Sequence, residues 1–271
     1  MRGRWLILAG VAIAVVNGVG CGGSEHATVD PEELLDSAAA HPIESADLDV
    51  DASLRVDGVA RLSGPLRVRL EGPFRSGGGE RIPSFDWHLS ASALGFPVGG
   101  RLVSTGENVY LTVYGNGYEV GPAGVAAANA RLEASGGLRP DVRSWLGAAR
   151  VTGQGSEGGE DCERISAPLR GQRMQRDLAP LAGSLGFALS RPTGRATACV
   201  GFDDRVLHEL ELDASMAVPP GSQSRLGGAS ALHLDADVVV SDVGQSDRIE
   251  APGGEFRPIR DLFLTLNDLA G

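Results

Sequence analysis

Two short stretches of the sequence nearly match known binding or catalytic motifs. In GQGSEG, Gly153, Gly155 and Gly158 follow the G-x-G-x-x-G order of a dinucleotide-binding turn. Such a turn opens a helix whose N-terminus binds the pyrophosphate, whereas here the acidic, strand-like GEDCERI follows. His208 begins an H-E-x-x-H motif, but Leu212 replaces its second histidine in a segment with the period of a strand. Neither nucleotide binding nor zinc-protease chemistry is therefore expected.

Other arrangements that carry chemistry are also missing. The chain contains no lysine and no G-x-S-x-G motif, which excludes P-loop, Schiff-base, Ser-Lys and nucleophile-elbow chemistry. Asp47, Asp49 and Asp51 share one face of a predicted strand and could bind calcium, but no EF-hand glycine and distal glutamate complete the loop. A solvated acidic face is the preferred interpretation. We expect no enzyme, no metal and no cofactor, with an envelope hydrolase as the weakest alternative.

Three histidines fall on predicted strands and have no shared aspartate or cysteine partner in the sequence. They are His88, His208 and His233. We therefore expect them at the surface or at strand edges.

The first residues have the layout of an export signal that stops at a cysteine. MRGRW is basic, and the apolar run Trp5–Val16 is shorter than the roughly 20 residues that cross a bilayer as a helix. Gly20-Cys21 then resembles the bacterial lipobox. The resemblance implies that residues 1–20 are a lipoprotein signal peptide and that residues 21–30 form a lipidated tether. Acyl chains on Cys21 would hold the protein on the extracytoplasmic face of the cell membrane; a plain thiol beside an uncleaved anchor is the alternative.

The two remaining cysteines are an even pair in a compartment that permits disulfides. We expect Cys162 and Cys199 to be bonded, which would stabilise the fold by about 3–4 kcal/mol in the chain-entropy model. Two buried free thiols are the alternative. Metal binding is disfavoured because no further histidine or cysteine lies near either one at ligand spacing.

Length and charge limit the domain organisation and the partners. The 271-residue chain has a net charge of −11, so it lacks the excess positive charge that binding to nucleic acid requires. Residues 31–271 are long enough for one domain with a single large core.

Alternation with period two predicts most of that domain to be β-sheet. Apolar and acidic residues alternate over 46–56, 207–218 and 231–243, which predicts strands with one apolar and one solvated face. Shorter alternating segments with glycine and asparagine turns predict an antiparallel meander over 66–120. Strands at 151–152 and 162–167 are expected to flank an exposed glycine-rich loop.

Helical spacing predicts five helices outside these strands. They are expected at 31–42, at 124–134, around Trp145, at 171–187 and at 256–269. Pro180 is expected to kink or break the fourth.

This order of elements resembles the LolA/LppX/LprG superfamily of lipid-carrying envelope proteins. The residues that carry the resemblance are ESADLDVDASLRVDG, RLVSTGENVYLTVYGNGYEV, the Trp145 segment and the final pair of long strands. The resemblance implies an α+β fold in which a curved antiparallel sheet forms a half-barrel and helices cover its concave apolar face. Acyl chains would lie between the sheet and the helices, which would open at 123–134 and 171–189.

A face lined by aliphatic rather than aromatic side chains suits acyl chains, because it offers dispersion contacts without unpaired polar groups. We therefore expect a lipid or other amphiphile as the ligand, with an ordinary solid core as the alternative. In that alternative the protein is a structural or interaction lipoprotein with an acidic outer surface. The predicted lining consists of Leu48, Val50, Leu54, Leu66, Val68, Leu70, Phe85, Trp87, Leu89, Leu210, Leu212, Met216, Leu232, Leu234, Val238 and Val240.

Overall fold

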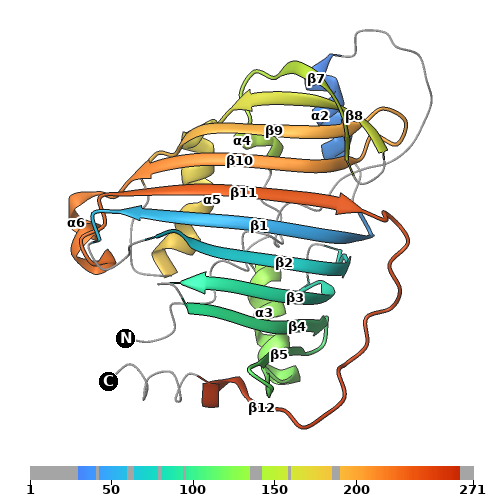
Figure 1. Ribbon diagram of the computed structural model, residues 1–271, viewed down its shortest axis with the longest axis vertical. Helices are drawn as coiled ribbons and strands as arrows, with labels where there is room; N and C mark the ends of the chain where they lie inside the picture. Colours follow the sequence, from blue (N-terminus) through green and yellow to red (C-terminus); the bar gives the residue numbers. More distant parts are fainter. Residues whose placement is uncertain are drawn as a thin grey trace.

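The computed structural model describes residues 30–40, 43–59, 64–78, 81–93, 96–134, 142–157, 160–184 and 190–262. These residues form one curved sheet of twelve strands in the order β12-β6-β5-β4-β3-β2-β1-β11-β10-β9-β8-β7 (Figure 1). Only β12 and β6 pair in parallel. The expected signal peptide, Cys21 and most of the tether lie outside the described residues.

The strands alternate along the chain with a few short helices. The strands are β1 (Ser45–Asp57), β2 (Leu66–Arg75), β3 (Ser84–Ala93), β4 (Phe96–Thr105), β5 (Val109–Val113), β6 (Asn116–Glu119), β7 (Arg150–Glu157), β8 (Glu160–Pro168), β9 (Thr193–Gly201), β10 (Leu207–Ala217), β11 (Ala231–Ser241) and β12 (Arg257–Pro258). The helices are α2 (Pro31–Ala40), α3 (Pro122–Ala134), α4 (Val142–Trp145), α5 (Gly171–Ser184), α6 (Pro220–Gln223) and the 3-10 helix η2 (Ser224–Leu226).

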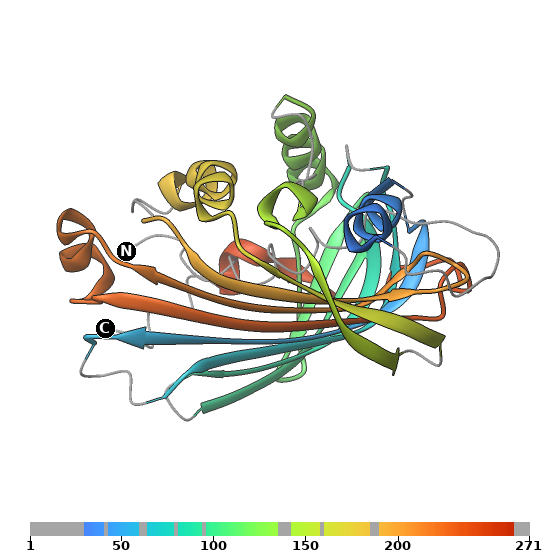
Figure 2. The same cartoon turned by 90° about the horizontal axis from the view of Figure 1, so that it is seen from above.

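The helices α2, α3, α4 and α5 all lie on one side of the curved sheet (Figure 2). This is the expected α+β half-barrel, with an inner face toward the helices and an outer face away from them. We call the two ends of the strands the α2 end, where β1 begins at Ser45, and the α6 end, where β1 stops at Asp57 and α6 joins β10 to β11. No helix among the described residues is long and apolar enough to cross a membrane.

Pairing in the middle of the sheet aligns the apolar residues of neighbouring strands. β1 lies between β2 and β11, so that Leu54 is opposite Leu66 on one side and Leu234 on the other. Because directly opposite residues point to the same face of a sheet, the apolar positions of these strands form continuous rows on the inner face. The acidic positions form matching rows on the outer face.

The start of the domain agrees with its sequence signals. The backbone N–H of Glu32 donates to Asp30 Oδ1 at 2.9 Å, so that Asp30 caps the N-terminus of α2. Leu34, Leu35 and Ala38 of α2 are buried in the main core with the α2-end rows of the sheet. Burial of this apolar helix face stabilises α2, which is otherwise too short to persist alone.

The glycine-rich segment was expected to be an exposed loop, and this expectation is wrong. It lies within β7, which pairs with β8 from Arg150 to Glu157. A Cβ at Gly155 would lie 2.7 Å from Nε of Arg164. The guanidinium of Arg164 forms an ion pair with Glu157, with 2.7 Å between Nη2 and Oε1. Glycine is needed here because the arginine crosses the strand, and this packing explains Gly155 without a nucleotide.

Three helix predictions also change. α5 continues through Pro180 to Ser184 instead of stopping at the proline, and α4 is only four residues long. Arg257 and Pro258, expected in the last helix, form β12, and residues from Phe263 onward lie outside the described residues.

Cys162 and Cys199 form the expected disulfide between β8 and β9. Their Cα atoms are 5.4 Å apart, and both residues are buried.

Candidate functional site

The sixteen residues predicted to line a ligand site all lie on the inner face, but the structure divides them into two groups. Nine are buried in the main core beneath the helices: Leu48, Val50, Val68, Leu70, Phe85, Trp87, Leu210, Val238 and Val240. Seven are only half-buried: Leu54, Leu66, Leu89, Leu212, Met216, Leu232 and Leu234. The face therefore changes character along its strands.

Strand register locates the boundary between the two groups. Val50 is opposite Val238 and Leu70, and Leu70 is opposite Leu89, so these residues form one row across the sheet. The other six half-buried residues lie between this row and the α6 end, and of the nine buried residues only Val68 lies there with them. We call these six half-buried residues, with Leu89, the half-buried aliphatic group.

The sequence analysis missed further members of the same surface. Ala52, Val56 and Ala236 lie on the inner face in this half of the sheet and are also half-buried. The alternation along β1 and β11 already includes them, so the sequence signal was present.

Helix α5 lies over the beginning of the half-buried aliphatic group. Met174 of α5 is buried against Ala214, and Leu212 and Leu234 pack against the same cluster. Trp145 Nε1 donates a hydrogen bond to Asp177 Oδ2 at 2.7 Å, which fixes α5 to α4. Between this contact and α6, the inner face of the sheet is covered less completely, because its leucines are only half-buried.

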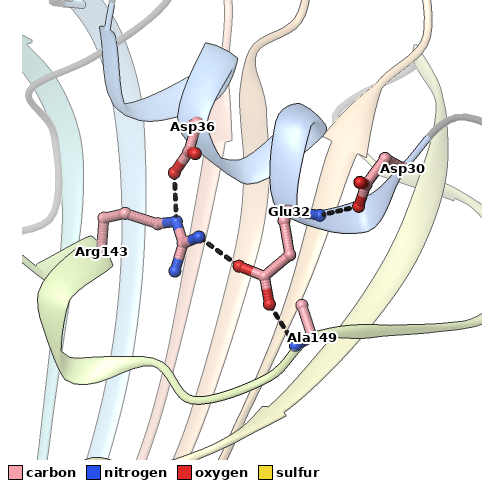
Figure 3. A network of polar contacts seen from close by, with 5 residues as sticks. All are labelled: Asp30, Glu32, Asp36, Arg143 and Ala149. Atoms are coloured by element: carbon pink, nitrogen blue, oxygen red, sulfur yellow. Dashed lines mark hydrogen bonds and ion pairs between the residues drawn. The ribbon is translucent and has the colours of Figure 1, made fainter.

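The α2 end, in contrast, is closed by a polar network (Figure 3). Glu32 accepts a hydrogen bond from the backbone N–H of Ala149 at 2.7 Å and forms an ion pair with Arg143. Arg143 also donates through Nε to Asp36 at 2.6 Å. The Ala149 bond, and then Arg143, lower the pKa of Glu32 against the opposing effect of burial. The network fixes α2 to the segment between α4 and β7.

Trp87 lies in the buried group and stacks on Phe85, with ring centroids 4.0 Å apart. Its indole Nε1 is buried without a hydrogen-bond partner among the described residues. An unpaired buried donor costs about 1–3 kcal/mol, so an acceptor oxygen reaching it would be favoured.

The outer face carries acids in adjacent strands. Asp237 is directly opposite Asp51 on β1 and Glu211 on β10. Asp49 instead accepts two hydrogen bonds from Arg69, at 3.1 and 2.5 Å. Within the described ranges, no group of three or more acidic, histidine or cysteine side chains is arranged to hold a metal ion.

His208 was expected at the surface or a strand edge, and this expectation is wrong. It is 2% exposed, and its Nε2 lies 2.9 Å from Oδ2 of Asp204. Burial opposes protonation of His208, but the bond to Asp204 and the charge of that carboxylate outweigh it and raise the pKa. In the sequence, the signal for this pairing is Asp204, four residues before His208. His88 is exposed, and His233 is half-buried.

Comparisons with known proteins return similar folds. No family model and no curated protein matches the sequence. The lipoprotein LppX of Mycobacterium tuberculosis is 11% identical with a TM-score of 0.41, over 82% of this chain and 94% of that one. LprF from Mycobacterium bovis is 14% identical with a TM-score of 0.44, over 87% and 100%. An outer membrane lipoprotein-sorting protein domain from Vibrio parahaemolyticus is 6% identical with a TM-score of 0.22, over 80% and 94%.

Proposed function

We propose that this chain is a non-enzymatic lipoprotein of the cell envelope that shelters the acyl chains of a lipid or other amphiphile. The acyl chains lie on the half-buried aliphatic group, between the α6 half of the sheet and α5. The single observation that carries the proposal is the uneven burial of the inner face. An ordinary core would bury both halves of that face to the same degree.

The energy of such binding comes from covering aliphatic surface that the fold leaves half-exposed. Each methylene of an acyl chain that leaves water contributes about 0.8 kcal/mol, so a chain of ten buried methylenes offers about 8 kcal/mol before the cost of immobilising it. The lining suits this ligand because its side chains bring no unpaired polar group. The indole N–H of Trp87 provides one donor deeper in the face for an ester or headgroup oxygen.

The membrane anchor completes the proposal. Diacylglyceryl modification of Cys21 after removal of residues 1–20 would place the domain on the extracytoplasmic side of the membrane, near its lipid ligand. Residues 21–30 would act as the tether, and residues 31–271 as one half-barrel domain. Whether the ligand is carried between membranes or only held is a separate question from whether it is bound.

The test is native mass spectrometry of the chain beginning at Gly22, purified from a lipid-rich bacterial host. This form retains every described element, since α2 begins at Pro31. We expect a one-to-one adduct with the mass of an acyl lipid, identified after solvent extraction. Leu232→Trp, which fills the half-buried surface, should remove the adduct, whereas His88→Trp on the outer face should not.

A bare polypeptide mass in the wild-type protein would refute the lipid-binding proposal. The second candidate would then be preferred, an interaction lipoprotein that presents the acidic outer face around Asp51, Asp237 and Glu211 to a partner. The observation that favours this candidate is the opposition of like charges across three strands, which a fold selected for stability alone would avoid.

A further inference from the structure

The charge of this protein is distributed unevenly between the two ends of the sheet. Although the chain is acidic, seven exposed arginines lie on the strand ends and connections of the α6 end and on the start of α5. We call them the arginine rim: Arg55, Arg67, Arg170, Arg173, Arg191, Arg195 and Arg225. The described residues of the same strand ends and connections carry three carboxylates, Asp57, Asp213 and Asp235.

The opposite end of the sheet has the opposite sign. Its connections carry Glu107 between β4 and β5, Glu160 and Asp161 at the start of β8, Asp203 and Asp204 after β9 and Asp242 after β11, against two arginines, Arg81 and Arg205. The molecule is therefore strongly polarised along its strands, with its positive end at α6. Beyond a Debye length of about 8 Å, only the nearest charges act on a partner, so this end can bind a negative surface despite the net charge.

Part of the rim is placed where positive charge is unfavourable to the fold. Arg170 and Arg173 flank the start of α5, and the first turn of that helix contains no acidic residue. The side chain of Arg191 packs close to Gly171 at the same point. Because a helix N-terminus is itself partly positive, these arginines repel it as well as one another. An anionic partner would remove this repulsion.

Half-exposed aliphatic side chains lie at the same end. Leu54 is opposite Leu66 and Leu234, and Leu232 is opposite Met216, so these members of the half-buried aliphatic group occupy the rows nearest α6. Aliphatic side chains beside arginines suit the boundary between the headgroups and the acyl chains of a bilayer.

From these observations we propose that the α6 end of the half-barrel docks on the surface of a bilayer that contains anionic phospholipid. The arginine rim contacts the headgroup phosphates. The half-buried aliphatic group then opens toward the membrane. The proposal takes from the proposed function only that the ligand is a lipid, and it adds the surface by which the protein meets the membrane.

The test is flotation of the chain beginning at Gly22 with vesicles of phosphatidylcholine alone or with phosphatidylglycerol. We expect binding only to the anionic vesicles and a strong decrease in about 0.5 M salt. Each arginine near an anionic surface contributes about a fivefold factor, so R67Q/R173Q/R191Q should weaken binding on the order of a hundredfold. The control R81Q/R131Q/R248Q removes the same charge from exposed arginines away from the rim and should change binding less than about threefold. Near-ultraviolet circular dichroism on every variant excludes misfolding as the cause of lost binding.

Three results would overturn the proposal: no binding to anionic vesicles, equal binding to both vesicle types, or equal loss in the two triple variants. Binding of an acidic protein to the rim in place of vesicles would likewise overturn it and assign the rim to a protein partner. Lipid extraction from the same samples distinguishes the two proposals. If the purified protein contains no lipid but binds vesicles, only the proposal that it shelters lipid is refuted. If it contains lipid but does not bind vesicles, only the docking proposal is refuted.

Discussion

Replacing Asp237 by asparagine should stabilise the fold, because this residue has two acids directly opposite it. Asp51 and Glu211 are its partners in the register on either side. Burial, and then the charges of Glu211, Glu157, Asp49 and Asp51, raise the pKa of Asp237. A carboxyl whose pKa is raised by folding destabilises the folded state once it ionises. The penalty is absent below the unfolded pKa, near 3.9, and complete above the folded pKa.

The size of the effect follows from the pairing geometry. Like charges directly opposite each other cost about 0.2–1 kcal/mol per pair, and Asp237 takes part in two such pairs. Since this face contacts solvent, screening keeps the sum near 1 kcal/mol. For a domain of this size, that corresponds to a rise in Tm of about 2–4 °C. The asparagine amide keeps the shape of the side chain and its contacts.

The assay is thermal and urea unfolding of wild type and Asp237→Asn between pH 3.5 and 8 at low salt. The gain should appear as the pH rises through the carboxyl range and should shrink in 1 M salt, where the Debye length is about 3 Å. Glu250→Gln is the matched control, because it removes one negative charge from an exposed position outside the sheet. An equal gain in the control would refute the reasoning, as would a gain that persists at pH 3.5.

The remaining predictions concern the disulfide, the buried histidine and the two halves of the inner face. Replacing Cys162 and Cys199 by serine should lower the free energy of unfolding by about 4 kcal/mol for a separation of 37 residues, measured by urea unfolding; no loss would contradict the chain-entropy account. Because folding raises the pKa of His208, its charged form stabilises the protein at low pH, and that stability is lost as the pH rises through the folded pKa. The stability difference between wild type and His208→Gln should therefore shrink as the pH rises above about 6.5, and NMR titration of the imidazole should show the raised pKa directly. Leu48→Ala should cost about 2–5 kcal/mol, whereas Leu232→Ala should cost less than about 1.5; equal costs would mean that the inner face is one uniform core.

The strands were predictable wherever the two faces of the sheet differ strongly in polarity. In β1, β10 and β11, aspartate or glutamate alternates with leucine or valine, so a period of two is unmistakable and the apolar face follows from it. β7 was predicted only at 151–152, because its two faces do not differ in this way. Its edge position leaves both faces polar, and Gly155 accommodates Arg164 rather than a turn.

The sequence predicted on which face of the sheet the candidate residues lie, but not how deeply each of them is buried. Alternation identifies that Leu48 and Leu232 share a face, yet only the placement of α2 and α5 decides that the first is buried and the second is not. Helix placement depends on long-range contacts such as those of Glu32 with Ala149 and Arg143, which no local pattern encodes. The burial of His208 was missed because its partner Asp204 lies in a loop outside the strand pattern.

The pairing of β1 with β11 has a consequence for how the polypeptide reaches this fold. The strands β1 to β6 and β7 to β11 are two meanders, and within the described sheet they are joined edge to edge through β1 and β11. During synthesis, β1 emerges early and its partner emerges some 180 residues later, as the opposition of Leu54 and Leu234 requires. Until then β1 keeps an unpaired edge of thirteen residues, which is a template for aggregation. Such distant pairing also slows folding, so the chain gains from an escort that covers this edge until β11 has been released.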